Sequence, residues 1–318
     1  MDLRIGMCFD RTFPPKVAPE FGTRLEAAGI DQLWVIEDVF HTTGIVLAAA
    51  ALTRTADLTV GMGILPAVAR NPAVTAMEIA TLAGLAPGRL IAGIGHGVQE
   101  WMGQMGARPA SPLTTLEEVL TAVRRLLRGE TVTAHGSHVT LDAVALEQPP
   151  DPVPPVLAGV RGPRSLALAG RVADGLVLAE GAGPSYVRSA IALAGAPHPF
   201  RVSAFTALCV TDDPRDARRI MTPFVAQLLA SPTANIRAHP HIDDLVERWE
   251  RRGDAGITDM PVDWWGEIGA IGTLDDAVAH VAALHEAGAD DVALFPAADV
   301  DIARSQIDDV MRVAGALR

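Results

Sequence analysis

The chain has 318 residues, of which 49% are hydrophobic, and it carries a formal net charge of −12 at pH 7. That much apolar side chain excludes a disordered chain, and no apolar run approaches the roughly 18 residues that a membrane-spanning helix needs. The acidic balance repels nucleic acid and anionic lipid, so we expect neither as a partner.

Several kinds of reactive site are absent from the sequence. Lys16 is the only lysine. Schiff-base and P-loop chemistry need a lysine beyond the first strand, so both are excluded. Cys8 and Cys209 lie in apolar, strand-like runs and are expected to be reduced and buried. The histidines form no HxxxH or HExxH pattern, so no metal site is predicted. The first ten residues include Asp2 and Arg4 and no long apolar stretch, which favours a cytoplasmic protein over a secreted one.

Apolar runs predict eight strands along the chain. They cover residues 3–9, 32–37, 58–65, 89–95, 154–160, 174–180, 200–210 and 291–296. Amphipathic or alanine-rich patterns predict helices after most of these strands. The helices are expected at about 21–29, 44–53, 72–86, 113–128, 163–170 and 184–194. Near-continuous apolar strands alternating with helices are typical of a buried parallel sheet, and eight such units predict an α/β fold, a (β/α)8 TIM barrel.

Two segments interrupt this alternation. Residues 130–147 alternate in polarity around Gly136-Ser137, which indicates a β-hairpin. Residues 213–270, between the seventh and eighth strands, have a mostly helical pattern and should fold over one end of the barrel. No shift in composition marks a linker, so 1–318 is interpreted as a single domain.

In such a barrel the chemistry lies at the carboxyl ends of the strands. The second strand ends with Glu37 and Asp38, and His41 follows within a short loop. Two adjacent carboxylates cannot both face the core, so at least one should point into the opening and accept a proton or a hydrogen bond. The alternative is that Asp38 caps the next turn and His41 is solvated.

Glycines are frequent near other strand ends. Gly61 and Gly63 lie inside the third strand, where they indicate either a bulge against a flat ligand or simple tight packing. A GxGxG run closes the fourth strand at 93–97, which alone is a weak signal. The fifth strand leads through 158–162 into a helix with Pro163 in its first turn.

That helix start favours an anion site. Its backbone N–H groups are free, and Arg161 and Arg164 add side-chain donors. The alternative is that both arginines are surface residues beside an ordinary helix start.

Four segments together resemble the luciferase-like monooxygenase superfamily. They are LEAAGIDQLWVIED (25–38), GMGILPAVARNPAVTAMEIATLAGLAPGRLIAGIGHG (61–97), GPRSLALAGRVADGLVL (162–178) and IGTLDDAVAHVAALHEAGADDVALFP (271–296). The resemblance covers almost the whole chain. It implies a TIM barrel that binds a flavin, or the deazaflavin coenzyme F420, at the carboxyl ends of its strands.

The resemblance also assigns residues. It implies a non-proline cis peptide at Gly63–Ile64 behind the coenzyme ring, and the acid at the end of the second strand matches Asp38. The residues implied beside the ring are Asn71, Gly95, His96 and Gly97. Those implied to hold the coenzyme phosphate are Ala158, Gly159, Gly162, Pro163 and Arg164.

The sequence departs from the deazaflavin-dependent sugar-phosphate and alcohol dehydrogenases of the superfamily. The catalytic histidine that follows the acid there is replaced by Val39, with His41 two residues on. The glutamate that follows the glycines of the fourth strand is replaced by Val98, with Glu100 nearby. The chain therefore resembles more closely the actinobacterial F420-dependent oxidoreductases whose second strand ends in Glu-Asp.

Three functions remain open. The first is an oxidoreductase that moves a hydride between F420 and a small organic substrate, with Asp38 or His41 handling the proton and with Arg70 and Arg161 meeting the anionic tail of the coenzyme. The second is an FMN-dependent monooxygenase, and the third is a barrel that binds a flavin or ligand without turnover.

Tryptophans are the candidates for shielding the reaction from water. Trp101, Trp264 and Trp265 are expected at the substrate, with core packing as the alternative reading of each. A homodimer is the expected assembly.

Overall fold

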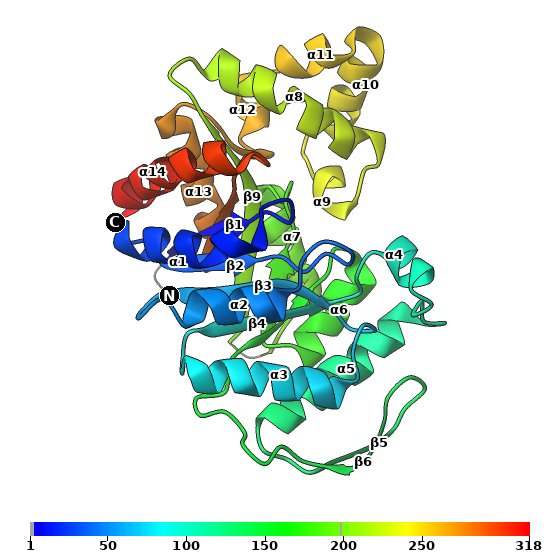
Figure 1. The fold of residues 1–318 in the computed structure, drawn as a ribbon. Coiled ribbons are helices and arrows are strands. Elements are labelled where there is room, and N and C mark those ends of the chain that lie inside the picture. The colour runs from blue at the N-terminus through cyan, green and yellow to red at the C-terminus, as the bar shows by residue number, and fades with distance from the viewer. Residues whose placement is uncertain (1–2, 198) are drawn as a thin grey trace.

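The computed structural model describes residues 3–197 and 199–318, and within them eight parallel strands close into a ring (Figure 1). The ring runs in the order β11, β1, β2, β3, β4, β7, β8 and β9, and β9 pairs with β11 to close it. The bounds are β1 (Arg4–Phe9), β2 (Gln32–Val35), β3 (Thr59–Pro66), β4 (Leu90–Gly95), β7 (Val156–Gly159), β8 (Gly175–Leu178), β9 (Arg201–Val210) and β11 (Asp291–Phe295). The predicted TIM barrel is confirmed.

Helices surround this ring, as Figure 1 shows. They are α1 (Ala18–Ala27), α2 (Gly44–Leu52), α3 (Pro72–Leu85), α5 (Pro112–Leu127), α6 (Pro163–Val172), α7 (Pro184–Ala194), α13 (Leu274–Glu286) and α14 (Val300–Leu317). Two short helices, η1 (Pro15–Val17) and α4 (Gln99–Gln104), lie in loops after β1 and β4. The described helices include none that is long and apolar enough to span a membrane.

Aromatic side chains fill the inside of the barrel. The ring of Trp34 lies 5.0 Å from that of Phe205, and the ring of Phe205 lies 6.0 Å from that of Phe295, both edge-on. A side chain at Gly61 would collide with Trp34, because a Cβ there would lie 2.3 Å from the indole. This glycine of the third strand therefore makes room for a core tryptophan.

A polar network closes the barrel at the start of its strands. The carboxylate of Asp291 is fully buried, and it accepts two hydrogen bonds of 2.6 Å from Arg201 and one of 2.6 Å from Gln32. Gln32 in turn accepts a bond of 2.7 Å from the indole of Trp34. A buried charge paired in this way is costly to disturb, so this end of the barrel is structural.

Both predicted insertions are present. Strands β5 (Val132–His135) and β6 (Thr140–Val144) form an antiparallel hairpin. The helical insertion contains α8 (Pro214–Ala230), α9 (Ala234–Arg237), α10 (Ile242–Arg252), α11 (Asp254–Thr258) and α12 (Val262–Trp265), which gather on one side of the barrel in Figure 1. Its apolar core also includes Ala207 and Cys209 of β9, so it packs onto the barrel.

One strand was not predicted from the sequence. Residues Gly269–Gly272 form β10, which pairs with β9 outside the closed ring. The predicted helical insertion, 213–270, therefore ends inside this strand.

Both cysteines are buried and free, as expected. Burial raises the pKa of each thiol, that of Cys209 to about 11, so neither is a reactive thiolate.

Candidate active site

The carboxyl ends of the strands form one end of the barrel, called here the mouth. In β3, the peptide between Gly63 and Ile64 is cis, and the pairing of β3 with β4 shifts between Met62 and Leu65. This bulge lies where the family resemblance places a cis peptide behind the coenzyme ring.

Glycines of the neighbouring strands surround the side chain of Ile64. A Cβ at Gly159 would lie 2.4 Å from its Cγ2, one at Gly93 would lie 3.0 Å from its Cγ2, and one at Gly95 would lie 3.1 Å from its Cδ1. We call these three residues the glycine cradle. They allow β4 and β7 to approach the bulge, so tight packing explains the glycines, and Ile64 keeps part of its surface exposed.

At the end of β2 the two carboxylates have different surroundings. Glu37 is 7% exposed and pairs with Arg70 through two hydrogen bonds, of 2.5 and 2.9 Å. Arg70 also forms an ion pair of 3.0 Å with Glu78, and its bonds to Glu37 raise its pKa. The guanidinium of Arg70 is thus engaged by two carboxylates, and its contact with a coenzyme tail stays a prediction.

Asp38 instead faces a cluster at the mouth. Its carboxylate accepts a hydrogen bond of 2.7 Å from Arg11, and the guanidinium of Arg11 lies 5.7 Å from the centre of the Trp101 ring. The ring of Trp101, on α4, is 6.1 Å from that of His41. The structure therefore brings together Asp38, His41 and Trp101, three predicted site residues from two strand ends.

Two backbone features shape this cluster. The N–H of His41 donates to the carbonyl of Asp38 at 3.0 Å, and between them Phe40 has a φ of 74° and a side chain that is 66% exposed. A left-handed conformation is uncommon for a bulky residue and is often found at functional sites. Arg11 follows the end of β1 by two residues, and only its position after a strand could have singled it out.

His96 links β4 to the start of α6. Its Nε2 lies 2.9 Å from the hydroxyl of Ser165, in the first turn of α6. Burial lowers the pKa of His96, so the imidazole is neutral at pH 7. Ser165 was not predicted; its place two residues after Pro163 was the only signal.

The start of α6 has the features of an anion site. Gly162 occupies the N-cap without a side-chain hydrogen bond, and Pro163 follows it. Arg161 lies 3.8 Å from Glu180, whereas Arg164 is exposed and makes no ion pair within the described ranges. Free N–H groups and the positive end of the helix dipole face outward here, which suits a phosphate.

Burial and a hydrogen bond hold the residues just before α6 in place. Ala158 is buried in β7, and the hydroxyl of Tyr186 donates to the carbonyl of Arg161 at 2.7 Å. Burial raises the pKa of Tyr186 to about 12, so this hydroxyl keeps its proton.

Asn71, another predicted site residue, caps α3 in the loop after β3. Its side chain accepts a hydrogen bond from the N–H of Ala73.

The structure places Trp264 and Trp265 apart from Trp101. Trp265 is 2% exposed in the core of the helical insertion. Trp264 stacks on His241, with ring centres 4.7 Å apart and planes within 10°. Both tryptophans pack the insertion, which favours the packing alternative over contact with a substrate.

The insertion nevertheless reaches the mouth. The side-chain amide of Asn235 donates to the carbonyl of Glu180, just after β8, at 2.6 Å. Glu267 accepts from the N–H of Ser185 at 3.0 Å and from its hydroxyl at 2.8 Å, at the start of α7. These bonds fix the insertion against the carboxyl end of β8.

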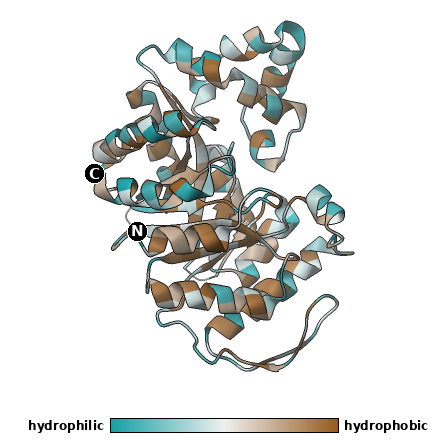
Figure 2. Cartoon of the chain, viewed as in Figure 1, coloured by the Kyte–Doolittle hydropathy of each residue, from teal (hydrophilic) through white to brown (hydrophobic). Residues whose placement is uncertain are grey.

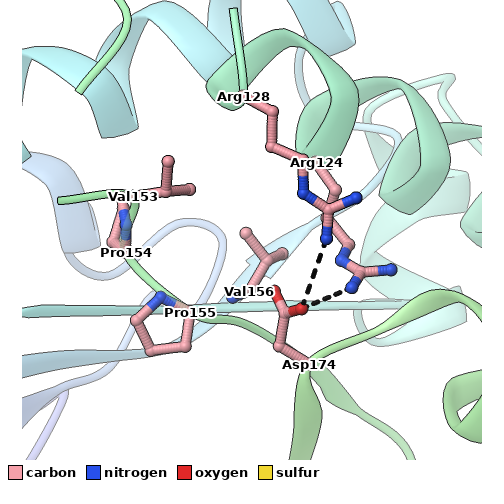
Figure 3. A pocket seen from close by; sticks show the side chains of 7 residues that line it. All are labelled: Arg124, Arg128, Val153, Pro154, Pro155, Val156 and Asp174. Atoms are coloured by element: carbon pink, nitrogen blue, oxygen red, sulfur yellow. Dashed lines mark hydrogen bonds and ion pairs between the residues drawn. The ribbon is translucent and has the colours of Figure 1, made fainter. Parts of the chain in front are cut away.

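A cavity of about 280 Å³ lies elsewhere, next to the starts of β7 and β8 (Figure 3). Arg124 and Arg128 both point toward Asp174 there, and Asp174 also accepts from the N–H of Val156 at 2.9 Å. The two arginines form ion pairs with Asp174 at the end of the barrel opposite the mouth, so we assign these groups a structural role. Across the described residues, no three His, Cys, Asp or Glu side chains gather to hold a metal ion.

Some curated relatives align with most of the chain, and others align with about half of it. It is 28% identical to 5,10-methylenetetrahydromethanopterin reductase of Methanolobus tindarius over 309 residues, which are 90% of this chain and 92% of that protein. It is 34% identical to F420-dependent glucose-6-phosphate dehydrogenase of Intrasporangium calvum over 190 residues, which are 54% of this chain and 56% of that protein.

Solved structures share the fold. The coenzyme F420-dependent tetrahydromethanopterin reductase of Methanopyrus kandleri has a TM-score of 0.82 at 19% identity, and both chains are covered completely. The oxygenating constituent of 3,6-diketocamphane monooxygenase from Pseudomonas putida, in complex with FMN, has a TM-score of 0.69 at 17% identity, covering 98% of this chain and 96% of that one.

A family model decides the classification. The model described as luciferase-like monooxygenase matches residues 7–291, which is nearly the whole barrel with both insertions. The chain belongs to the luciferase-like monooxygenase family.

Proposed function

We propose that the protein is an oxidoreductase that transfers a hydride between coenzyme F420 and a small organic substrate. The observation that carries this proposal is the pairing, at one barrel end, of the Gly63–Ile64 bulge with the uncapped, arginine-bearing start of α6. A flat ring needs a surface such as the bulge to lie against. An anionic tail needs hydrogen-bond donors such as those at the start of α6. Relatives named as F420-dependent enzymes add support.

The residues present fit such a coenzyme. The start of α6, with Gly162, Pro163 and Arg164, would hold the phosphate, and Arg161 and Arg70 would meet the remaining charge of the tail. The ring would lie against the bulge and near Asn71. The other residues proposed to contact it are Gly95, His96, Gly97, Ala158 and Gly159. When bound, the deazaflavin supplies the carbon that gives or takes the hydride.

The proton is assigned to the chain's own residues. Asp38 or His41 would hold or accept the substrate proton, since both lie beside Trp101 at the mouth. Trp101 would exclude water from the reacting atoms. Val39 and Val98 occupy the positions where related dehydrogenases carry a histidine and a glutamate, so we propose an acid–base arrangement different from theirs.

FMN is the second candidate coenzyme, in a monooxygenase that uses reduced flavin and oxygen. The fold similarity to an FMN-bound monooxygenase favours it. The two coenzymes are distinguished by titrating the purified protein with each and following the quenching of coenzyme fluorescence. Binding of FMN without binding of F420 would overturn the first proposal.

Arg164→Ala tests the phosphate site directly. We expect coenzyme binding to weaken by about 1.5–3 kcal/mol, as for the loss of a hydrogen bond to a charged group. Arg171→Ala is the matched control, because Arg171 is an exposed arginine on the same helix that pairs with Glu117 instead. If both variants bind the coenzyme as tightly as the wild type does, Arg164 is not part of the phosphate site.

The setting of the enzyme is part of the proposal. We infer a cytoplasmic protein that acts on a small molecule, similar to F420-dependent oxidoreductases of actinobacteria. We further propose that it works as a homodimer, because two neighbouring outer helices leave apolar side chains exposed.

A further inference from the structure

We propose that Arg11 determines substrate specificity and that the substrate is a small carboxylic acid with an apolar body. The carboxylate of the substrate binds the guanidinium of Arg11, and the apolar body lies against Trp101 and its exposed apolar neighbours. This inference rests on the proposed function and deepens it, because it names the chemical class of substrate that the same mouth accepts.

The guanidinium of Arg11 has hydrogen-bond donors to spare. Its Nη1 donates to Oδ2 of Asp38 at 2.7 Å, and within residues 3–197 and 199–318 the guanidinium makes no other hydrogen bond. An arginine carries five N–H donors in a planar fork, and this fork matches the two oxygens of a carboxylate. Most of the N–H groups of Arg11 are therefore available to a ligand.

Arg11 is the outer member of its pair with Asp38. Its side chain is 42% exposed, whereas that of Asp38 is 25% exposed. The guanidinium also lies 5.7 Å from the centre of the Trp101 ring. A carboxylate on one side and an aromatic ring on another restrict the arginine, so it loses less conformational entropy when it binds a ligand. A cationic ligand would be repelled by Arg11 and would find the acid already paired, which favours an anionic ligand.

Other carboxylates near the mouth are engaged elsewhere. Oδ1 of Asp10 accepts from the N–H of Thr12 at 2.8 Å and from its hydroxyl at 2.6 Å. Glu180 lies 3.8 Å from Arg161. Among the described residues, the acid at the end of β2 is thus the one carboxylate that pairs with Arg11. A second carboxylate, supplied by a substrate, can occupy the remaining donors.

An apolar stripe on α4 lies beside this arginine. Val98, Trp101 and Met105 follow one another at intervals of three and four residues, which places them on the same side of a helix. Val98 is 45% exposed and Met105 is 40% exposed, whereas Met102 is fully buried and anchors the helix to the protein. The stripe is therefore an exposed apolar surface that includes the ring next to Arg11.

The rest of α4 is polar. Figure 1 shows this short helix at the mouth end of the barrel, and Figure 2 shows hydrophilic residues on it, in contrast to the mainly hydrophobic α3. The polar residues are Gln99, Glu100 and Gln104. Val98 occupies the position where related dehydrogenases carry a glutamate, so an apolar group replaces a charge there. Burying this stripe against the apolar body of a substrate removes it from water, which is favourable.

Phe40 adds a second exposed apolar side chain at the mouth. It is 66% exposed, and its φ of 74° is unfavourable for a bulky residue. Its neighbour in the chain, His41, has its ring 6.1 Å from that of Trp101. A phenyl ring that packs so little against the protein, held in a strained backbone next to the candidate acid–base residues, suits contact with a ligand.

The polar and the apolar parts of this surface meet at the residues proposed to handle the proton. Arg11 is bonded to Asp38, and the Trp101 ring lies next to His41. A substrate held by Arg11 at its carboxylate and by Trp101 at its apolar body would therefore lie beside both candidate proton-handling groups.

Three small probes separate the two parts of the surface. Phenylacetate carries both a charge and a ring, phenylacetamide keeps the ring without the charge, and acetate keeps the charge without the ring. Ligand-observed NMR titration of the purified protein measures each affinity. We expect phenylacetate to bind at least about tenfold more tightly than either other probe, as for the gain of a hydrogen bond to a charged group. Equal binding of phenylacetate and phenylacetamide, or no binding of phenylacetate, would overturn the proposal.

Variants then assign the preference to Arg11. Arg11→Gln should abolish the preference for phenylacetate over phenylacetamide, and Arg11→Lys should keep part of it because the charge remains. Arg219→Gln, which removes an exposed arginine of α8, is the matched control and should bind all three probes as the wild type does. An Arg11→Gln protein that still prefers the carboxylate would overturn the assignment.

Phe40→Asn tests the apolar part. Asparagine tolerates a left-handed backbone better than phenylalanine does, so the loop should keep its conformation. We expect this variant to bind phenylacetate more weakly and acetate unchanged. Unchanged binding of phenylacetate would remove Phe40 from the surface.

Titrations with and without saturating F420 separate this proposal from the proposed function. A carboxylate preference that depends on Arg11, in a protein that does not bind F420, would support the substrate class and overturn the coenzyme. Binding of F420 without any preference for phenylacetate over phenylacetamide would support the coenzyme and overturn the substrate class.

Discussion

At the scale of single residues, Arg11 organises the mouth. It is hydrogen-bonded to Asp38 and lies over the ring of Trp101, so it links the ends of β1 and β2 to α4. Asp38, His41 and Trp101 could be proposed from the sequence because they follow predicted strands and match the family. Arg11 could not, because neither the spacing of β1 nor a motif distinguishes it from other loop arginines.

A double-mutant cycle on Arg11 and Asp38 tests this arrangement. Both side chains are partly exposed, so we expect a coupling of about 0.5–1 kcal/mol between Arg11→Gln and Asp38→Asn, measured from the rate of hydride transfer. Each single variant should slow the reaction, and the double variant should be little slower than either. Arg219→Gln with Asp216→Asn, an exposed pair on α8, is the control and should leave the rate unchanged. Independent, additive effects of Arg11 and Asp38 would show that the pair does not act as a unit.

At the scale of elements, the sequence predicted the eight barrel strands and both insertions because long apolar runs and turn residues determine them. It missed β10, since the four residues of Gly269–Gly272 are too few to show a period. It also placed the end of β2 at Glu37, whereas the strand ends at Val35. Glu37 leaves the strand to meet Arg70, a contact 33 residues away that no local pattern encodes.

The glycine cradle gives a prediction at this scale. Gly159→Ala would place a Cβ 2.4 Å from Cγ2 of Ile64, and we expect overpacking to lower the free energy of unfolding by about 1–3 kcal/mol. Adding Ile64→Ala should restore part of that loss, because it removes the colliding atoms. Gly315→Ala on α14 meets no atom within 4 Å and should be neutral or slightly stabilising. Denaturant unfolding of the variants measures these differences, and a Gly159→Ala protein as stable as the wild type would contradict the cradle.

At the scale of the whole molecule, a buried histidine joins the barrel to the helical insertion. His280 of α13 lies between the hydroxyl of Thr206 in β9 and the carbonyl of Gly266 after α12, with both bonds at 2.8 Å. A carbonyl only accepts, so Nδ1 carries the proton and Nε2 accepts from Thr206. In this neutral form, both ring nitrogens are hydrogen-bonded. No local pattern in the sequence singles out this residue, because its two partners come from separate elements.

Burial lowers the pKa of His280 to about 4, and this makes stability depend on pH. Below about pH 6.5 the unfolded chain binds a proton at this residue, while the folded chain does not until about pH 4. Unfolding is therefore favoured as the pH falls across this window, by up to about 3 kcal/mol from His280 alone. Carboxylates also contribute, so the difference between proteins is the quantity to measure. We expect His280→Gln to be less stable than the wild type at pH 7 and to lose less stability between pH 6.5 and 4, whereas His285→Gln should follow the wild-type slope. Parallel curves for wild type and His280→Gln would mean that the junction between barrel and insertion does not sense pH through this side chain.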